Sequence, residues 1–363
     1  MSKVALTRGN SRFESISKAL NLALADYDWS SCNFILIKPN FVSTTNQLAA
    51  THVDAVRAVI RFVREHTGAL VVIGEGTANS NTWEGFLNFG YMKLREEFTN
   101  VTFLDLNDDE ITELTAYTRS LKPQQLHVAL TPMESNCVIS VGPPKVHDTV
   151  IFTGSLKNVV MGSIVNRDTV RMPLNSRKKR LLAPVKKRLK KIRFLDDLRD
   201  RALNQGLSRH FTHSHKVLMH QGYSVINLNL FVMAFQGLHP HISVIDGWDA
   251  MEGPGPTEGD PVPWRIAVVS TDFLAADSLT SWMMGFPSEN VGYLHYCAVA
   301  GLGEADISKM EIVGDLSPEE AYRPFKPHPL YGRQVKWRDP KIEAMVEGIA
   351  MTRILPGTGD RSG

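Results

Sequence analysis

The sequence predicts an α/β protein built on a doubly wound, mostly parallel, Rossmann-like sheet with a basic helical insertion. Short apolar runs typical of buried strands alternate with longer segments whose apolar residues recur at helical spacing. Polar residues and glycines follow several of these runs directly, as at strand ends in such sheets. The 363 residues, 43% hydrophobic and 21% charged, suffice for one large domain or two closely packed ones.

Residues 1–135 are expected to form an N-terminal α/β half. Strands are predicted at 34–37 (FILI), 70–73 (LVVI) and 101–106 (VTFLDL). Between the first two, residues 51–65 carry valine and isoleucine at helical spacing and end before Gly68, which predicts a helix. Two further helical segments, 83–89 and 91–98, precede the third strand.

A second α/β half, residues 136–176 and 220–300, is expected to carry the site. It contains predicted strands at 137–141 (CVISV), 242–245 (ISVI) and 265–270 (RIAVVS), and predicted helices at 223–236 and 273–284. The C-terminal residues 301–363 hold five prolines between Pro318 and Pro340, which predicts an irregular tail that wraps the surface.

Residues 177–219 are expected to be an insertion that begins with a strongly basic helix. Residues 177–193 (RKKRLLAPVKKRLKKIR) hold ten Lys or Arg and no acid, and their apolar residues recur at helical spacing around Pro184. Such a helix suits an anionic membrane surface or an acidic protein, or it packs its apolar stripe on the main domain. Nucleic acid is the least favoured partner, because no RNA-binding motif lies nearby.

Composition argues against several other classes of protein. No apolar run approaches the eighteen residues of a membrane span, and the first residues show no secretory pattern. Cys32, Cys137 and Cys297 lie far apart, which suits a reducing cytoplasm and excludes a local iron–sulfur cluster motif. We therefore expect a cytoplasmic protein, with peripheral membrane association through the basic helix left open.

Polar clusters follow five predicted strands, where open α/β sheets bind ligands. They begin at Lys38, Glu75, Lys145, Asp246 and Ser270. Gly253-x-Gly255 lacks the spacing of a phosphate-binding loop. His210, His213, His215 and His220 have ligand-like spacing, but no cysteine joins them, so metal is a minor alternative there.

The segment from Gly142 to Gly162 concentrates the candidate chemistry. It holds two lysines, an imidazole and an amide between Gly-Pro-Pro and Thr-Gly-Ser turns, a pattern that favours a site for an anionic or carbonyl-bearing small molecule over a solvated loop. We expect His147 to be a general acid/base and Lys157 to anchor or activate the ligand. The expected substrate-binding residues are Lys38, Asn40, Glu75, Thr77, Lys145, Ser155, Asn158, Asp246, Glu252 and Asp277.

These motifs resemble, in order, an uncharacterised family called domain of unknown function 362. The resemblance covers roughly residues 3–290 and rests on Lys38-Pro39-Asn40, Thr51-His52, Glu75-Gly76, Lys145-x-His147, Thr153-Gly154-x-Leu156-Lys157-Asn158 with Gly162, Asp246-Gly247, Met251-Glu252-Gly253-x-Gly255-Pro256, Ser270-Thr271-Asp272 and Ala276-Asp277. Many members of that family carry ferredoxin-type clusters, but this chain lacks the cysteines for one.

A more remote similarity links His147, Gly154 and Lys157 to nickel-pincer lactate racemases. There the matching histidine transfers a proton and the matching lysine bonds to the cofactor, which implies these roles for His147 and Lys157. Two features differ: Ala78 follows Gly76-Thr77 where the racemases place a second histidine, and no histidine occurs between residues 148 and 209. The cofactor is therefore left unknown, with a nickel pincer or a divalent cation as less favoured alternatives.

The resulting expectation is an enzyme that acts on a small carboxylate- or phosphate-bearing molecule by acid/base chemistry of the isomerase or oxidoreductase type. The alternative is a non-catalytic binding or scaffold protein that docks through the basic helix.

Overall fold

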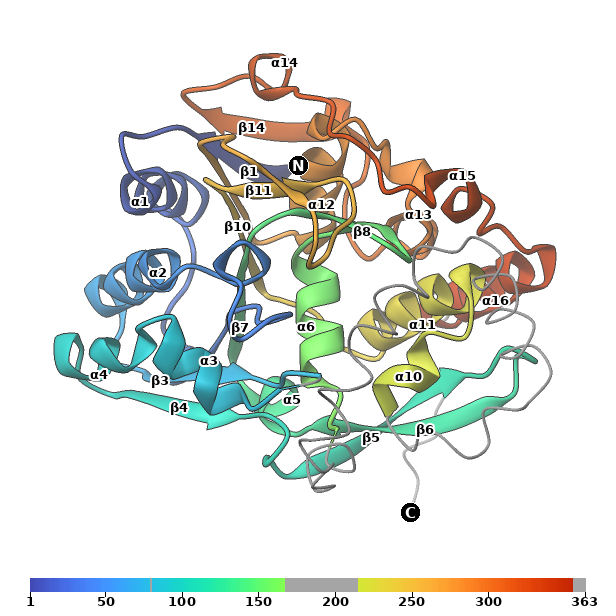
Figure 1. Cartoon of the computed structure of the whole chain (residues 1–363), viewed down its shortest axis with the longest axis horizontal. Coiled ribbons are helices and arrows are strands. Elements are labelled where there is room, and N and C mark those ends of the chain that lie inside the picture. Colours follow the sequence, from blue (N-terminus) through green and yellow to red (C-terminus); the bar gives the residue numbers. More distant parts are fainter. Residues whose placement is uncertain (79, 167–214, 355–363) are drawn as a thin grey trace, which may run out of the picture.

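The computed structural model describes residues 1–78, 80–166 and 215–354 and centres on an eight-stranded sheet (Figure 1). In spatial order its strands are β14 (Met310–Gly314), β1 (Ser2–Thr7), β13 (Ile266–Ser270), β10 (Ile242–Gly247), β7 (Cys137–Gly142), β2 (Phe34–Lys38), β3 (Leu70–Glu75) and β4 (Val101–Asp105). Every neighbouring pair is parallel except the two made by β13, which is antiparallel to both β1 and β10. The predicted mostly parallel sheet is confirmed.

Helices cover both faces of the sheet, as a doubly wound fold requires (Figure 1). One face packs against α1 (Arg12–Ala23), α2 (Val53–His66), α3 (Thr82–Asn88) and α4 (Leu94–Glu97). The other packs against α6 (Ser155–Ser163), α11 (Tyr223–Phe235), α12 (Phe273–Met283), α13 (Gly292–Val299) and α16 (Pro340–Ile354). Successive strand residues alternate between the two cores: Ile35 and Ile37 face the α1–α2 side, and Leu36 faces the α6 side.

Two smaller sheets and several short helices complete the described structure. A four-stranded sheet has the order β12 (Asp260–Val262), β11 (Ala250–Glu252), β8 (Lys145–His147) and β9 (Ile151–Thr153), and β5 (Ile111–Tyr117) pairs with β6 (Pro123–Ala129) as a hairpin. The short helices are η1 (Gln47–Ala49), η2 (Tyr91–Lys93), α5 (Thr131–Glu134), α10 (His215–Met219), η4 (Ser288–Asn290), η5 (Ile307–Lys309), α14 (Pro318–Ala321) and α15 (Tyr331–Gln334).

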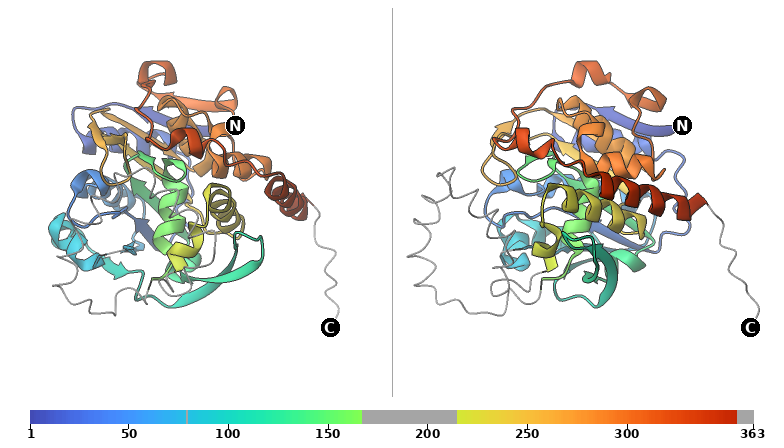
Figure 2. Two further views of the ribbon diagram at one scale, coloured as in Figure 1. Left: turned by 45° about the vertical axis from the view of Figure 1, so that its right-hand side comes forward. Right: turned by 90° about the vertical axis from the view of Figure 1, so that its right-hand side faces the viewer.

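The expectation of an irregular tail over residues 301–363 is wrong for residues 301–354, the part of it that the structure describes. Strand β14 pairs with β1 in parallel at the edge of the central sheet, with Ser2 opposite Met310 and Leu6 opposite Gly314. Helix α16 places Ile342, Val346 and Ala350 in the core, and Figure 2 shows it running beside α11 and α13. The five prolines flank these elements or occupy the first position of a helix, where proline is tolerated.

The antiparallel β13 also changes one predicted polar cluster. Because β13 runs against its neighbours, Ser270 lies opposite Ser243 near the beginning of β10, so the cluster Ser270–Asp272 lies away from the carboxyl ends of the other strands. Asp272 there begins α12, accepting from Leu274 N at 2.9 Å and Ala275 N at 3.0 Å.

The basic run 177–193, with His210 and His213, lies outside the described residues. In the part of the chain that the structure describes, no helix is both long and apolar enough to cross a bilayer.

Candidate functional site

Helix α6 begins directly over a row of polar residues in the central sheet. Strand register places Lys38, Ser140, Ser243 and Ser270 side by side across β2, β7, β10 and β13. The Ser140 hydroxyl donates to the Ser155 carbonyl at 3.2 Å, and the Ser243 hydroxyl donates to the Ser155 hydroxyl at 2.8 Å. The small serine side chains therefore let α6 approach the sheet closely.

Asp277, from α12, holds the first turn of α6. Its carboxylate accepts from Ser155 N at 2.6 Å, Ser155 Oγ at 2.8 Å and Leu156 N at 3.0 Å, whereas α6 has no side-chain cap at its own Gly154. Burial raises the pKa of Asp277 to about 6 against the effect of these hydrogen bonds. A Cβ at Gly154 would overlap the carboxylate. Asp277 and Ser155 thus make structural contacts, and their role in substrate binding stays a prediction.

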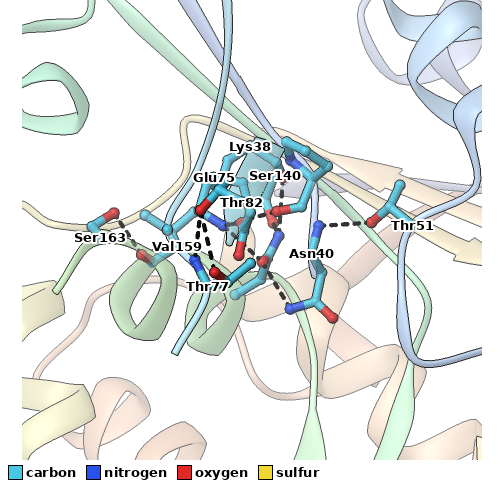
Figure 3. Close-up of polar contacts among 12 residues, drawn as sticks. Lys38, Asn40, Thr51, Glu75, Thr77, Thr82, Ser140, Val159 and Ser163 are labelled. Carbon is cyan, nitrogen blue, oxygen red and sulfur yellow. Dashed lines mark hydrogen bonds and ion pairs between the residues drawn. The ribbon is translucent and has the colours of Figure 1, made fainter. Parts of the chain in front are cut away.

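Lys38 and Glu75 form a buried ion pair at the ends of β2 and β3 (Figure 3). Lys38 Nζ also donates to the Pro39 carbonyl at 2.8 Å. Gly162 of α6 leaves room for this lysine, because a Cβ there would overlap the ammonium group. The pair brings together two predicted residues from neighbouring strands.

Asn158 connects α6 to the ends of β2 and β7. Its Nδ2 donates to the Lys38 carbonyl and to Ser140 Oγ, each at 3.0 Å. Its Oδ1 accepts from Asn40 Nδ2 at 3.2 Å and from Lys38 Nζ at 3.3 Å. Both the nitrogen and the oxygen of the Asn158 amide are hydrogen-bonded, and these bonds position Lys38 and Asn40.

Lys145, on β8, is the second lysine of the site. Its ammonium group donates to Asn40 Oδ1 and to the Ala49 carbonyl, the latter at 3.1 Å. Asn40 is in turn fixed through its backbone N–H, which donates to Thr51 Oγ1 at 2.8 Å (Figure 3). Lys145 therefore approaches the ends of β2 and β7 from the smaller sheet.

Lys216 brings a third lysine to the same place, from α10. Its ammonium group donates to the Gly76 carbonyl, directly after β3. The sequence analysis did not predict Lys216 as a site residue, because its neighbours His215 and His220 carry the recognisable spacing in that segment. A lysine within a short apolar helix gave no signal of its partner.

Lys157 is the fourth lysine and differs from the other three. It lies on α6 and makes no hydrogen bond or ion pair with any residue that the structure describes. Its exposed fraction is 7% and that of Lys216 is 6%, whereas Lys38 and Lys145 are 0% exposed. All four lysine side chains are therefore buried, Lys157 and Lys216 slightly less than the other two.

The four side chains, which we call the lysine cluster (Lys38, Lys145, Lys157 and Lys216), shift one another's titration. Burial, with smaller effects of Lys216 and Lys145, lowers the pKa of Lys38 well below its usual range. Burial and the neighbouring Lys157 ammonium lower the pKa of Lys145 to about 7. Burial lowers the pKa of Lys216 to about 7 and that of Lys157 to about 8.

His147, at the end of β8, is 5% exposed and lies beside this cluster. Burial, then the Lys157 ammonium, lowers the pKa of the imidazole well below its usual range. Its Nδ1 accepts from Thr149 N at 3.0 Å and lies 3.1 Å from Asp148 Oδ1. The tautomer that carries its proton on Nε2 accepts the hydrogen bond from Thr149 N at Nδ1. The other donates from Nδ1 to Asp148 and leaves Nε2 with a lone pair that can accept a proton.

The C-terminal segment closes over this histidine. Gln334, from α15, is 1% exposed and donates from Nε2 to the His147 carbonyl at 2.6 Å. This hydrogen bond connects α15 to β8. Neither Gln334 nor Asp148 was among the predicted site residues, and nothing in a single sequence indicates either contact.

Three predicted residues make other contacts. Arg12 Nε lies 2.8 Å from Asp246 Oδ2, and burial raises the pKa of this carboxyl. Glu252 is partly exposed and accepts from Lys326 N at 3.0 Å. Thr77 is buried in the turn after β3 and bonds to Ser80 and Thr82. Their role in substrate binding stays a prediction.

The described residues offer no metal-binding cluster of three or more His, Cys, Asp or Glu side chains. Of the predicted histidine group, His215 Nδ1 accepts from His127 N at 2.9 Å, and His220 Nδ1 contacts the Lys216 carbonyl at 2.8 Å. Within the described ranges the donor set does not fit a metal or a nickel pincer, so we derive no chemistry through either. A hollow of about 470 Å³, lined in part by Trp282, Glu289 and His295, contains no residue of the lysine cluster.

The family described as domain of unknown function (DUF362) matches residues 35–281, more than half of the chain. No curated protein matches the chain. This is a match to a family whose activity is not known, and the matched range includes all four residues of the lysine cluster.

Two solved structures are distantly similar. The lactate racemase apoprotein from Thermoanaerobacterium thermosaccharolyticum is 18% identical, with a TM-score of 0.33, over 44% of this chain and 39% of that one. A protein from Thermotoga maritima is 13% identical, with a TM-score of 0.40, over 73% of this chain and 57% of that one. The chain spans less than two thirds of either protein, and neither similarity bears on function.

Proposed function

The chain belongs to the DUF362 family, whose function is unknown, and we propose that it is an enzyme that binds a small carboxylate- or phosphate-bearing molecule and moves a proton on it. The lysine cluster would hold the anion, and His147 would transfer the proton. This proposal depends most on one observation: four lysines, each at most 7% exposed, lie near one another, and among the described residues only Glu75 forms an ion pair with any of them.

Such an arrangement is unfavourable without a counter-charge. Burying a single ammonium group costs several kcal/mol unless an opposite charge or strong hydrogen bonds compensate. Lys38 has Glu75, but Lys145 and Lys216 donate only to neutral oxygens and Lys157 donates to none among the described residues. An anion placed among the last three would supply the missing charge.

The same groups suit proton transfer. His147 is uncharged at neutral pH because its pKa is lowered, and Asp148 lies where it accepts from Nδ1–H once Nε2 takes a proton. The neighbouring ammonium groups would stabilise negative charge that develops on a carbonyl or carboxylate oxygen of the substrate. Together they match removal of a proton from carbon next to a carboxylate or carbonyl.

Deuterium exchange tests the proposal. The full chain is incubated in deuterium oxide with pyruvate, malonate, lactate or acetoacetate, and NMR follows loss of the exchangeable carbon-bound proton. We expect enzyme-dependent exchange in at least one of them, and its loss in His147→Gln. The control is His66→Gln, a histidine at the end of α2 on the opposite face of the sheet.

Two outcomes would count against the enzyme. Exchange that persists in His147→Gln would remove the histidine from the chemistry. No exchange with any of the four compounds, in a protein whose melting temperature nevertheless rises with them, would leave a binding protein in place of an enzyme.

The role of the basic run 177–193 stays a separate prediction. Its residues lie outside the described ranges, so docking on an anionic membrane or an acidic protein rests on the sequence alone. No contact in the described structure favours the scaffold alternative over the enzyme.

A further inference from the structure

We propose that Lys157 forms an imine with the carbonyl carbon of a 2-oxo acid, and that the neighbouring lysines hold the carboxylate of that acid. The inference rests on the proposed function and names its substrate class. It treats Lys157 as a catalytic residue and the three other lysines as charged partners.

The contacts select Lys157 from the lysine cluster. The Lys38 ammonium is paired with Glu75, Lys145 donates to Asn40 and Ala49, and Lys216 donates to Gly76. A nitrogen held in such bonds is not free to attack carbon. Lys157 has no such bond to a described residue, and it keeps the largest exposed fraction of the four.

The surroundings of Lys157 also favour a neutral amine. Burial and the Lys216 ammonium, opposed by Asp148, lower the pKa of Lys157 to about 8. An ordinary lysine titrates near 10.4, so the lowered value gives roughly a hundredfold more neutral amine near neutral pH. Lys145 and Lys216 have lower values still, of about 7, and a carboxylate bound between them would favour their charged forms. Their hydrogen bonds leave Lys157 as the amine with no described partner.

A 2-oxo acid presents the two groups that this arrangement accommodates. Its carboxylate supplies the counter-charge for Lys145 and Lys216, whose ammonium groups are close enough to the Lys157 amine to affect one another's pKa. Its adjacent carbonyl carbon would then lie next to the free amine. A simple ketone or aldehyde lacks the first group, and phosphate lacks the second.

The chemical step is balanced without an added reactant. The Lys157 nitrogen adds to the carbonyl carbon to give a carbinolamine. His147 Nε2 accepts the proton released from nitrogen and returns it to the departing hydroxyl, so that one water leaves and a carbon–nitrogen double bond remains. The imine then draws electrons from the neighbouring carbon, which eases the proton removal assigned above to His147.

Reductive trapping tests the imine. The full chain is incubated with pyruvate and cyanoborohydride, which delivers hydride to the imine carbon and leaves a secondary amine. We expect one adduct, heavier by the mass of pyruvic acid less one oxygen atom, and peptide mapping should place it on Lys157. Labelling there should exceed that of any surface lysine by more than about tenfold, given the difference in neutral amine.

Matched variants and ligands sharpen the result. Lys157→Arg keeps the positive charge and should lose the adduct, whereas Lys122→Arg, at an exposed turn of the β5–β6 hairpin, should keep it. Butanone, which has the ketone but no carboxylate, should label Lys157 far less than pyruvate, and oxalate should protect it.

Absence of an adduct with pyruvate, 2-oxobutyrate and 2-oxoglutarate, or labelling spread evenly over surface lysines, would overturn the imine. The melting temperature separates this result from failure of the proposed function. If oxalate still raises the melting temperature, the proposed anion site is supported and only the imine proposal fails. If oxalate has no effect either, both proposals fail.

Discussion

Lys38 and Glu75 show how the ends of two strands are joined inside the protein. Both side chains are at most 4% exposed, and burial, with smaller effects of two other ammonium groups, lowers the pKa of Lys38. Within residues 1–78, 80–166 and 215–354, Glu75 is the buried carboxylate that forms an ion pair with the lysine cluster.

Removing one partner of this pair should be costly. We expect Glu75→Leu to lower the free energy of unfolding by about 3–5 kcal/mol, because it leaves an uncompensated buried ammonium. The double variant Lys38→Met with Glu75→Leu should lose less than the single one. Urea unfolding of the four proteins gives the coupling energy, and additive losses would show that the two charges do not interact.

At the residue scale, part of the site could be predicted from strand ends. Lys38, Asn40, Glu75 and Lys145 follow strands and do converge on Asn158 and one another. Asp246 also follows a strand, but its carboxylate pairs with Arg12 of α1. A residue at a strand end lies near the edge of the sheet. The residue that it contacts there depends on helices that are distant in sequence.

Helix α6 is the element on which the site depends. It carries Lys157 and Asn158, begins at the carboxylate of Asp277, and passes Lys38 at a glycine. Because Gly162 lies directly against the Lys38 ammonium group, a shift of α6 would also displace Lys38.

Gly162→Ala should damage the site and lower stability. The added methyl group would overlap Lys38 Nζ, so helix or lysine must move, at a cost of about 1–3 kcal/mol. The control is Gly348→Ala on α16, which meets no atom within 4 Å and should be neutral or stabilising by up to about 1 kcal/mol.

Thermal and urea unfolding measure both changes. Equal effects of the two substitutions would contradict the close packing of Lys38 against α6. Oxalate-induced shifts of the melting temperature should be reduced in Gly162→Ala and preserved in Gly348→Ala.

At the element scale, strands and helices were predictable but strand direction was not fully so. The run 265–270 reads as a buried strand, and β13 confirms it, yet it is antiparallel to β10. A parallel neighbour needs a crossover, usually a helix, and the residues between 247 and 266 show no helical spacing. The absence of a crossover helix in this segment is the sequence feature that indicates an antiparallel strand.

The C-terminal part was predicted least well. Strand β14 is partly exposed at a sheet edge, and α16 owes its place to packing on α11 and α13. Both depend on contacts with distant segments, which local spacing and proline content do not report. The hairpin β5–β6 was also missed, although residues 111–117 alternate in burial.

Considered as a whole, the molecule brings together lysines with lowered pKa values from β2, β8, α6 and α10. Anion binding should therefore depend on pH. Free Lys145 and Lys216 lose their protons near pH 7 and Lys157 near pH 8, so the charge that attracts an anion decreases as pH rises.

We expect the affinity for oxalate to fall as pH is raised from about 6 to about 9, and the melting shift to fall with it. Lys157→Gln should weaken binding at low pH and flatten this dependence, and the surface variant Lys122→Gln should change neither. Affinity that is constant over this range would show that the lysine charges are not the binding groups.

Calorimetric titration of the full chain with oxalate at pH 8, in buffers of different ionisation enthalpy, tests the central claim most directly. A bound carboxylate stabilises the charged lysines, so their pKa values rise and the complex should take up protons from the buffer. Uptake that disappears at pH 6, where the lysines are already charged, is the predicted result. Binding without proton uptake at pH 8, or no binding at either pH, would contradict an anion site built on these buried lysines.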